Sequence, residues 1–259
     1  FWNGGIGTYV KASWETHRDA DDAANDNLRV NADELRARAV GEGGNLGFTQ
    51  AARVEFAMKG GAINTDAIDN SGGVDMSDHE VNLKILLAQE VGARRLKADA
   101  RDALIRKFTE EIADQVLANN DLHARQISLD RVRSLRDPFP FGRAIEWIAE
   151  QGGPSAIDLA LPTADDLSRR AELRQGLPPP ELAVVSAWVK MLLQKQLENA
   201  GESDITGLHR MLQEYCPKDI RKNYPKGIDT HMLAGPIGQT VALTRLVADT
   251  GAGFVTGLL

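Results

Sequence analysis

The stretch that most constrains the fold runs from residue 62 to residue 80 and has the sequence AINTDAIDNSGGVDMSDHE. We predict a short apolar strand over Ala62 to Ile68, a break at Asn70 to Gly73, and a long amphipathic helix from about Ser77. Two consecutive glycines between strand and helix would let the backbone take positive φ and approach a ligand closely. The helix start would offer unpaired N–H groups and a positive dipole end to a carboxylate or phosphate. Since open α/β sheets bind ligands beyond the carboxyl ends of their strands, the stretch predicts a binding site.

A second strand–loop–helix unit comes before this stretch. Ala37 to Val40 is predicted to form a short strand, and a helix is predicted over Gln50 to Met58. Gly43 and its neighbours permit close backbone approach, and Asn45 offers both a donor and an acceptor at the strand tip. Taken alone, this pattern favours an asparagine turn that binds no ligand. The helix residues expected to face the sheet are Ala51, Val54 and Met58.

Strands and helices alternate over the first ninety residues, which predicts a parallel sheet with right-handed crossovers. The phosphate-binding G-x-G-x-x-G unit is missing from this sequence, so we expect only the second half of a Rossmann-like domain. From about residue 95 the periodicity is helical throughout, and Ser203 or Asp204 is predicted to cap a late helix. The predicted fold class is α/β followed by all-α: a partial Rossmann-like parallel half-sheet over residues 1–94 and a helical region over 95–259. A buried helical stripe is predicted at Leu104, Phe108, Ile112 and Val116.

Composition excludes several classes of protein. The net charge of −7 indicates no basic face and argues against nonspecific nucleic-acid binding. A single cysteine, Cys216, excludes an internal disulfide framework and fits a reducing cytoplasm. No apolar run approaches the roughly 20 residues needed to cross a bilayer, so no membrane partner is expected. Because the chain starts with Phe1 rather than methionine, at what resembles a strand end, we interpret it as an excised fragment.

Several separated motifs resemble the large NAD-specific glutamate dehydrogenases of bacteria. Two of them, GEGGNLGFTQ (Gly41–Gln50) and INTDAIDNSGGVDMSDHEVN (Ile63–Asn82), are related to E-G-A-N and D-I-x-x-N-A-G-G-V-x-x-S of the small glutamate dehydrogenases. The resemblance covers most of the chain, densely to about residue 90 and thinly after it. Segments that resemble the large class specifically are Gly4–Lys11, Ala24–Val30, Pro180–Val184 and Tyr215–His231.

The resemblance implies an activity and a set of roles. The activity is NAD-dependent oxidative deamination of L-glutamate to 2-oxoglutarate and ammonium, by a longer chain that is expected to be a homo-oligomer. Asn45 and Asn70 match cofactor-contacting asparagines. Ser77, together with Val74, matches the positions that contact the glutamate side chain and its distal carboxylate. The lysine and aspartate that carry the chemistry in this family lie upstream, so no catalytic residue is expected in this chain. Two positions in glycine-containing loops are expected beside the cofactor, Gly43 and Thr8.

Residue chemistry alone leaves simpler roles open. Ser77 could act only as an N-cap, Asn70 as a left-handed turn residue, and the loop from Gly4 to Thr8 as a tight turn. The whole chain could also be a non-catalytic helical interaction or regulatory module, or part of another amino-acid or 2-hydroxy-acid dehydrogenase. Against the last alternative, a serine at a helix start suits a distal carboxylate better than a branched aliphatic side chain.

One departure from the small enzymes concerns Asp78-His79-Glu80, which follow Ser77 where an aromatic residue is usual. A histidine beside two acids is typical of a metal ligand or a general base. Acids are also favoured near the positive end of a helix dipole, so we predict a solvated first helical turn. The other histidines show no H-x-x-x-H or H-E-x-x-H spacing, and no metal site is expected.

Overall fold

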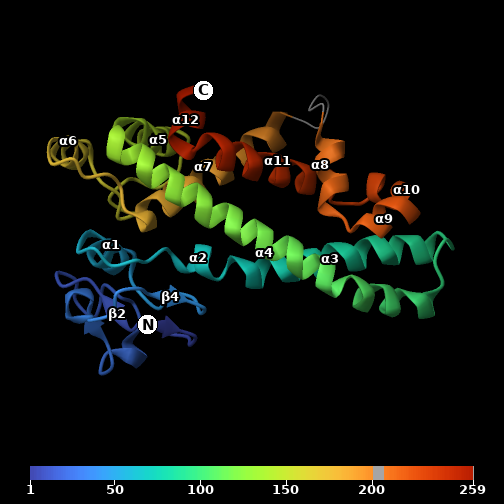
Figure 1. The fold of residues 1–259 in the computed structure, drawn as a ribbon, viewed down its shortest axis with the longest axis horizontal. Coiled ribbons are helices and arrows are strands. Elements are labelled where there is room, and N and C mark those ends of the chain that lie inside the picture. The colour runs from blue at the N-terminus through green and yellow to red at the C-terminus, as the bar shows by residue number, and fades with distance from the viewer. Residues whose placement is uncertain (201–206, 259) are drawn as a thin grey trace. The chain divides into compact units, whose positions relative to one another are not determined.

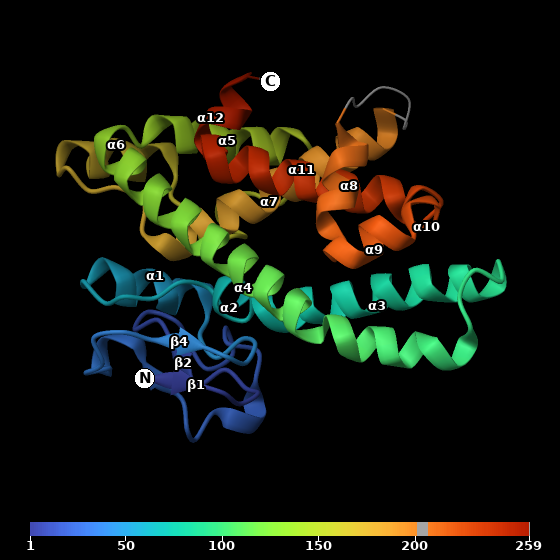
Figure 2. The ribbon, with the colours of Figure 1, turned by 45° about the vertical axis from the view of Figure 1, so that its right-hand side comes forward.

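The structure, a computed structural model, describes residues 1–200 and 207–258, so the predicted cap at Ser203 or Asp204 lies outside the described residues. The described part is mostly helical (Figures 1 and 2). Its strands are β1 (Trp2–Asn3), β2 (Val10–Lys11), β3 (Val30–Asn31) and β4 (Gly41–Glu42). Its helices are α1 (Gln50–Met58), α2 (Asp66–Asp69), α3 (Ser71–Gly92), α4 (Ala98–Arg136), α5 (Phe139–Glu150), α6 (Ala164–Glu172), α7 (Pro179–Ala200), α8 (Leu208–Tyr215), α9 (Lys218–Asn223), α10 (Pro225–Asp229), α11 (Ala234–Thr250) and α12 (Ala252–Val255).

The chain forms two compact units, each built from segments that are distant in the sequence. The first unit comprises Phe1–Ser71, Leu122–Leu192 and Val247–Leu259. The second unit comprises Gly72–Asp121 and Leu193–Leu246. The predicted division at residue 94 concerns domains defined along the sequence, and it stays a prediction.

The parallel pairing expected near the N-terminus is present, but in small pieces. β1 pairs with β4 and β2 pairs with β3, both in parallel, with Trp2 opposite Gly41 and Val10 opposite Val30. Isolated parallel bridges add Phe48 beside Val10 and Ala62 beside Ala39. In Figures 1 and 2 the strands lie together beside α1. Each strand spans two residues, so the described residues form short parallel pairs rather than a continuous half-sheet.

The stretch from residue 62 to 80 folds differently from the prediction. Only Ala62 makes a strand-like bridge, and Asp66–Asp69 is the short helix α2 instead of the end of a strand. Helix α3 begins at Ser71 rather than at Ser77, so Gly72 is helical and does not adopt positive φ. The apolar residues favoured a strand, but the Asp66 carboxylate at the start of α2 is held by Arg53 and by the Leu46 N–H, while the Thr65 side chain makes no capping hydrogen bond.

Helix α1 confirms the predicted boundaries but not the predicted buried face. Thr49 caps it by accepting a hydrogen bond from the Ala52 N–H at 3.1 Å. Ala52 and Phe56 are buried, whereas Met58 of the predicted face is 41% exposed. The larger apolar area of the phenylalanine decides which face turns inward. The core that contains α1 consists of Val10, Ala32, Val40, Phe48, Ala52, Phe56 and Ile63.

The second unit has its own apolar core. The predicted stripe on α4 is confirmed, since Phe108, Ile112 and Val116 are buried and Leu104 packs against them. In both ribbon views α8, α9 and α10 lie beside one another (Figures 1 and 2). The other buried members of this core are Leu83, Leu86, Leu87, Leu212, Cys216, Ile220, Ile228 and Ile237.

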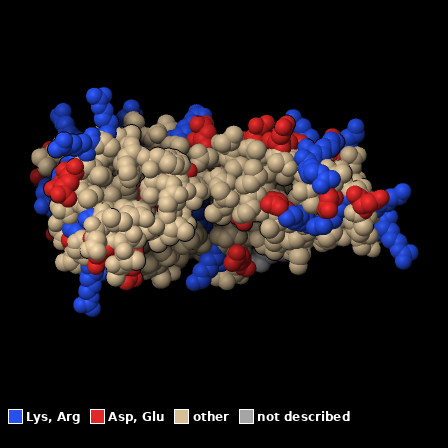
Figure 3. Space-filling model, turned by 90° about the horizontal axis from the view of Figure 1, so that it is seen from below, with Lys and Arg blue, Asp and Glu red and all other residues tan. Residues whose placement is uncertain are grey.

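Surface charge and helix hydrophobicity bear on possible partners. Acidic and basic side chains are interspersed on the face that Figure 3 shows. Within residues 1–200 and 207–258, no helix combines the length and apolar character that crossing a bilayer requires.

Candidate functional site

Two asparagines predicted to face a cofactor lie in hydrogen-bond contact in the first unit. Asn45 is exposed in the loop after β4, and Asn70 is half-buried at the end of α2. The Asn70 Nδ2 donates to the Asn45 Oδ1 at 3.1 Å. Asn70 has φ of −100°, so it is not a left-handed turn residue. The pair retains a donor, the Asn45 Nδ2, and an acceptor, the Asn70 Oδ1, that bond to no described residue.

A buried ion pair joins the elements that carry these asparagines. Glu42 ends β4 and is fully buried, with 0% of its surface exposed. Arg53 of α1 donates to both of its oxygens, from Nε at 2.7 Å and from Nη2 at 3.0 Å. The Arg53 Nη2 also lies 3.3 Å from the Asp66 Oδ1 at the start of α2. One guanidinium therefore ties together α1, the end of β4 and α2.

Two aspartates of α2 hold the backbone of the loop. The Asp66 Oδ2 accepts from the Leu46 N–H at 2.7 Å, and the Asp69 Oδ2 accepts from the Glu42 N–H at 2.9 Å. Burial raises the pKa of the Glu42 carboxyl, and these two aspartates raise it further, while the Arg53 guanidinium opposes the rise. The loop is thus anchored at both ends, on either side of Asn45.

Leu46 stores backbone strain beside Asn45, because its φ is +60° and left-handed backbone is costly for a leucine. Leu46 is 64% exposed. Replacing it with glycine should leave the free energy of unfolding unchanged or raise it by up to about 1 kcal/mol. The matched control is Leu117→Gly, at a 67% exposed position inside α4, which should cost about 1 kcal/mol. Urea unfolding of the purified chain measures both free energies of unfolding. An equal loss of stability in the two variants would show that Leu46 is not strained.

The glycines of this loop are required by packing against the chain's first residues. A Cβ on Gly43 would lie 2.2 Å from the ring of Trp2, and one on Gly44 would lie 2.1 Å from the Gly5 carbonyl oxygen. The N–H groups of Gly43 and Gly44 both donate to the Asn3 carbonyl, at 2.8 and 3.0 Å. The close approach that Gly43 was predicted to allow is therefore made by Trp2, and its contact with a cofactor stays a prediction.

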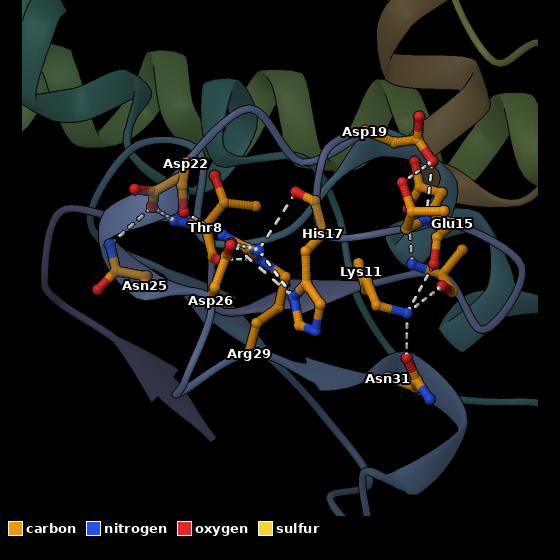
Figure 4. Close-up of polar contacts among 12 residues, drawn as sticks. Thr8, Lys11, Glu15, His17, Asp19, Asp22, Asn25, Asp26, Arg29 and Asn31 are labelled. Atoms are coloured by element: carbon orange, nitrogen blue, oxygen red, sulfur yellow. Dashed lines mark hydrogen bonds and ion pairs between the residues drawn. The ribbon is translucent and has the colours of Figure 1, made fainter.

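Thr8 lies in a separate polar network near the N-terminus (Figure 4). Its N–H donates to the Asp22 Oδ2 at 2.8 Å, and its carbonyl accepts from the Arg29 Nε at 2.8 Å. The buried Arg29 also contacts the Asp26 carboxylate and the His17 Nδ1, at 2.5 and 3.0 Å. The network fixes the backbone of Thr8, which is itself buried, and its contact with a cofactor stays a prediction.

Ser77 and Val74 lie one turn apart on α3, in the second unit, and both are exposed. The Ser77 Oγ donates to the Val74 carbonyl at 2.8 Å. Since α3 begins at Ser71, Ser77 is neither an N-cap nor a helix start, and both of those expectations are wrong. The structure thus brings the two asparagines together in the first unit and this pair together in the second.

His79 is buried, so the predicted solvated turn is wrong. Its ring stacks on that of Tyr215 with centroids 4.0 Å apart, and its Nε2 lies 3.5 Å from the Asp75 Oδ1. Burial lowers the pKa of the imidazole, and Asp75 and Asp78 oppose that shift. Its spacing of four residues from the buried Leu83 could have indicated an inward position. In the described part of the chain, no group of three or more potential metal-ligating side chains is found.

Two segments of the chain, one from each end, match models of known protein families. Residues 1–130 match the family model for the catalytic domain of bacterial NAD-glutamate dehydrogenase. The chain belongs to this bacterial NAD-glutamate dehydrogenase family. Residues 174–259 match the model for the glutamate dehydrogenase C-terminal region. The resemblance inferred from the motifs is therefore confirmed, and both residue pairs described above lie in the segment that matches the catalytic domain.

Three curated relatives are named NAD-specific glutamate dehydrogenase. The chain is 40% identical to the Mycobacterium tuberculosis protein over 96% of its length, and 42% identical to the Pseudomonas aeruginosa protein over 99%. It is 38% identical to the Halomonas elongata protein over its whole length. It spans 15% of the first relative and 16% of the other two, so it corresponds to a small part of each bacterial NAD-glutamate dehydrogenase.

Proposed function

We propose that this chain works within a longer NAD-dependent glutamate dehydrogenase, which converts L-glutamate to 2-oxoglutarate and ammonium. Family membership and the names of the relatives support the reaction. NAD, when bound, supplies the hydride acceptor. The residues of this chain bind and orient, and we assign none of them to proton transfer or to covalent chemistry. The short parallel pairs would then belong to a Rossmann-like cofactor domain, and residues 95–259 to a helical region.

The Asn45–Asn70 pair carries the proposal. Each asparagine uses one half of its amide for the other, which leaves one N–H donor group and one carbonyl acceptor at the surface. A primary carboxamide offers the complementary acceptor and donor, and the nicotinamide of NAD bears such a group. The pair would orient the ring by holding this carboxamide. We assign a backbone contact to Gly43 and a hydroxyl contact to Thr8 in the same cofactor site.

Ser77 and Val74 are proposed to contact the substrate. The Ser77 hydroxyl now donates to a carbonyl of its own helix and can turn toward a carboxylate instead. A hydrogen bond to a charged acceptor is stronger than one to a neutral carbonyl, so glutamate would compete well for this donor. The exposed Val74, one turn earlier, would pack against the methylene groups of the substrate.

We further propose that the longer protein is a cytoplasmic homo-oligomer without nucleic-acid or membrane partners. The net charge of −7 supports the absence of a nucleic-acid partner, and the single cysteine, which is free and buried, supports a reducing compartment. The homo-oligomer is proposed from the family resemblance.

Kinetics of the full-length enzyme that carries these residues test the two assignments. Asn70→Ala should raise the KM for NAD about tenfold and leave the KM for glutamate nearly unchanged, because it removes one or two hydrogen bonds. Ser77→Ala should do the reverse, with a rise of about tenfold for glutamate. Ser168→Ala is the matched control, since this exposed helical serine also donates to its own helix, at 3.0 Å.

Unchanged constants in both variants would remove these residues from the site. Absence of glutamate-dependent NADH formation by the unaltered full-length protein would defeat the dehydrogenase proposal, and leave the helical interaction module as the alternative.

A further inference from the structure

The hydrogen bonds around Arg53 end one residue away from each asparagine of the proposed site. The Asp66 carboxylate lies 3.3 Å from the Arg53 guanidinium. It accepts a hydrogen bond from the backbone N–H of Leu46, the residue after Asn45. Arg53 also donates to both carboxylate oxygens of Glu42. The backbone N–H of Glu42 in turn donates to the side chain of Asp69, the residue before Asn70. The loop that carries Asn45 and the helix α2 that ends at Asn70 are therefore fastened to each other through one buried side chain.

Arg53 itself does not reach the ligand-facing groups. It is 5% exposed, and its side-chain hydrogen bonds within the described residues go to Glu42 and, at 3.4 Å, to Gln50. The pair with Glu42 is bidentate, and this planar fork fixes direction as well as distance. A lysine would keep the positive charge but could not reproduce the fork. An arginine-to-lysine substitution at this position therefore tests the geometry of the hydrogen bonds without changing the charge.

The loop needs such a fastening because its own conformation is unfavourable. Leu46 is held at φ of +60°, and the hydrogen bond from its N–H to Asp66 is part of what keeps it there. If Asp66 moved, Leu46 could relax to an ordinary backbone conformation, and the adjacent Asn45 would turn with it. The spacing of 3.1 Å between the two amides would then be lost.

We infer that Arg53 is a positioning residue, which sets the Asn45–Asn70 pair in the geometry that receives the cofactor carboxamide. This inference rests on the proposed function of that pair. Its effect is on cofactor recognition and not on the glutamate side of the reaction.

The test uses the full-length enzyme with Arg53→Lys, Asn70→Ala and the double variant. Arg53→Lys should raise the KM for NAD about tenfold, with little change in the KM for glutamate, because a misplaced binding group loses its contact. In the Asn70→Ala background the same substitution should have a much smaller effect, since the group that it positions is already gone. A merely structural role would lower the amount of active enzyme without changing the KM for NAD.

Arg170→Lys is the matched control, because Arg170 forms an equally bidentate pair with the buried Glu181, at 2.6 and 2.9 Å. It should leave the KM for NAD unchanged. Should Arg53→Lys fail to yield folded enzyme, Glu42→Gln tests the same link from the other side, with the same expected rise.

The inference is overturned if Arg53→Lys leaves the KM for NAD unchanged, or if its effect multiplies fully with that of Asn70→Ala. Failure of the proposed function is seen separately, since Asn70→Ala alone would then leave the KM for NAD unchanged.

Discussion

Gly44→Ala should lower the free energy of unfolding of the chain by about 2–3 kcal/mol, because the added methyl group has no space. Its Cβ would lie 2.1 Å from the carbonyl oxygen of Gly5. That neighbour is backbone, so it cannot move aside as a flexible side chain would. The N–H of Gly44 is also bonded to Asn3, and the shift needed to relieve the clash would break this hydrogen bond. Urea unfolding of the purified variant measures the loss.

Gly92→Ala serves as the control for this prediction. Gly92 is the last residue of α3, and a Cβ there would meet no atom within 4 Å. Since alanine is a better helix former than glycine, the control should be neutral or slightly more stable. A comparable loss in both variants would show that the space around Gly44 does not decide the outcome.

Arg170→Met should destabilise the first unit by about 3–5 kcal/mol at neutral pH, because it leaves a buried carboxylate without its partner. The Glu181 side chain is 1% exposed, and Arg170 donates to both of its oxygens. Replacing both residues by methionine should recover much of the loss, since a buried ion pair can be exchanged for apolar packing. A double variant no more stable than the single one would contradict this account.

The cost of Arg170→Met should depend on pH in a defined direction. Burial raises the pKa of Glu181, and without the guanidinium nothing offsets that rise. A carboxyl whose pKa is higher in the folded state binds more protons there, so stability falls as the pH increases. The deficit relative to the unaltered chain should be smallest near pH 4, about the pKa of an unfolded glutamate, and should widen toward pH 7.

Features governed by neighbouring residues could be predicted from the sequence. Thr49 marks the start of α1 through a hydrogen bond from an N–H three residues later, and Thr163 and Asp166, also three residues apart, form a capping box at α6. The stripe through Phe108 and Ile112 follows from helical spacing alone. In each case the physical cause lies within one or two helical turns, so the local pattern suffices.

The errors fall where distant contacts decide. The residues from Ala62 to Ile68 have the composition of a strand, but Asp66 serves Arg53 and the Leu46 N–H, and these partners are not visible in the local pattern. His79 turned inward because α3 starts six residues earlier than predicted and Tyr215 provides a stacking surface. For the candidate site, the motifs indicated Asn45 and Asn70 separately. Their direct hydrogen bond and their support by Arg53 required the three-dimensional arrangement.

Cys216 lies within the core of the second unit, and its low reactivity would allow a cysteine introduced elsewhere to be labelled selectively. The thiol is buried, and burial raises its pKa to about 12. At pH 8 the thiol would therefore remain protonated, and the thiolate is the form that reacts. A maleimide dye would therefore not react with the native cysteine, and would react with a cysteine introduced at an exposed position such as Asn27. Fluorescent reporters can be placed in either compact unit without first removing the natural thiol.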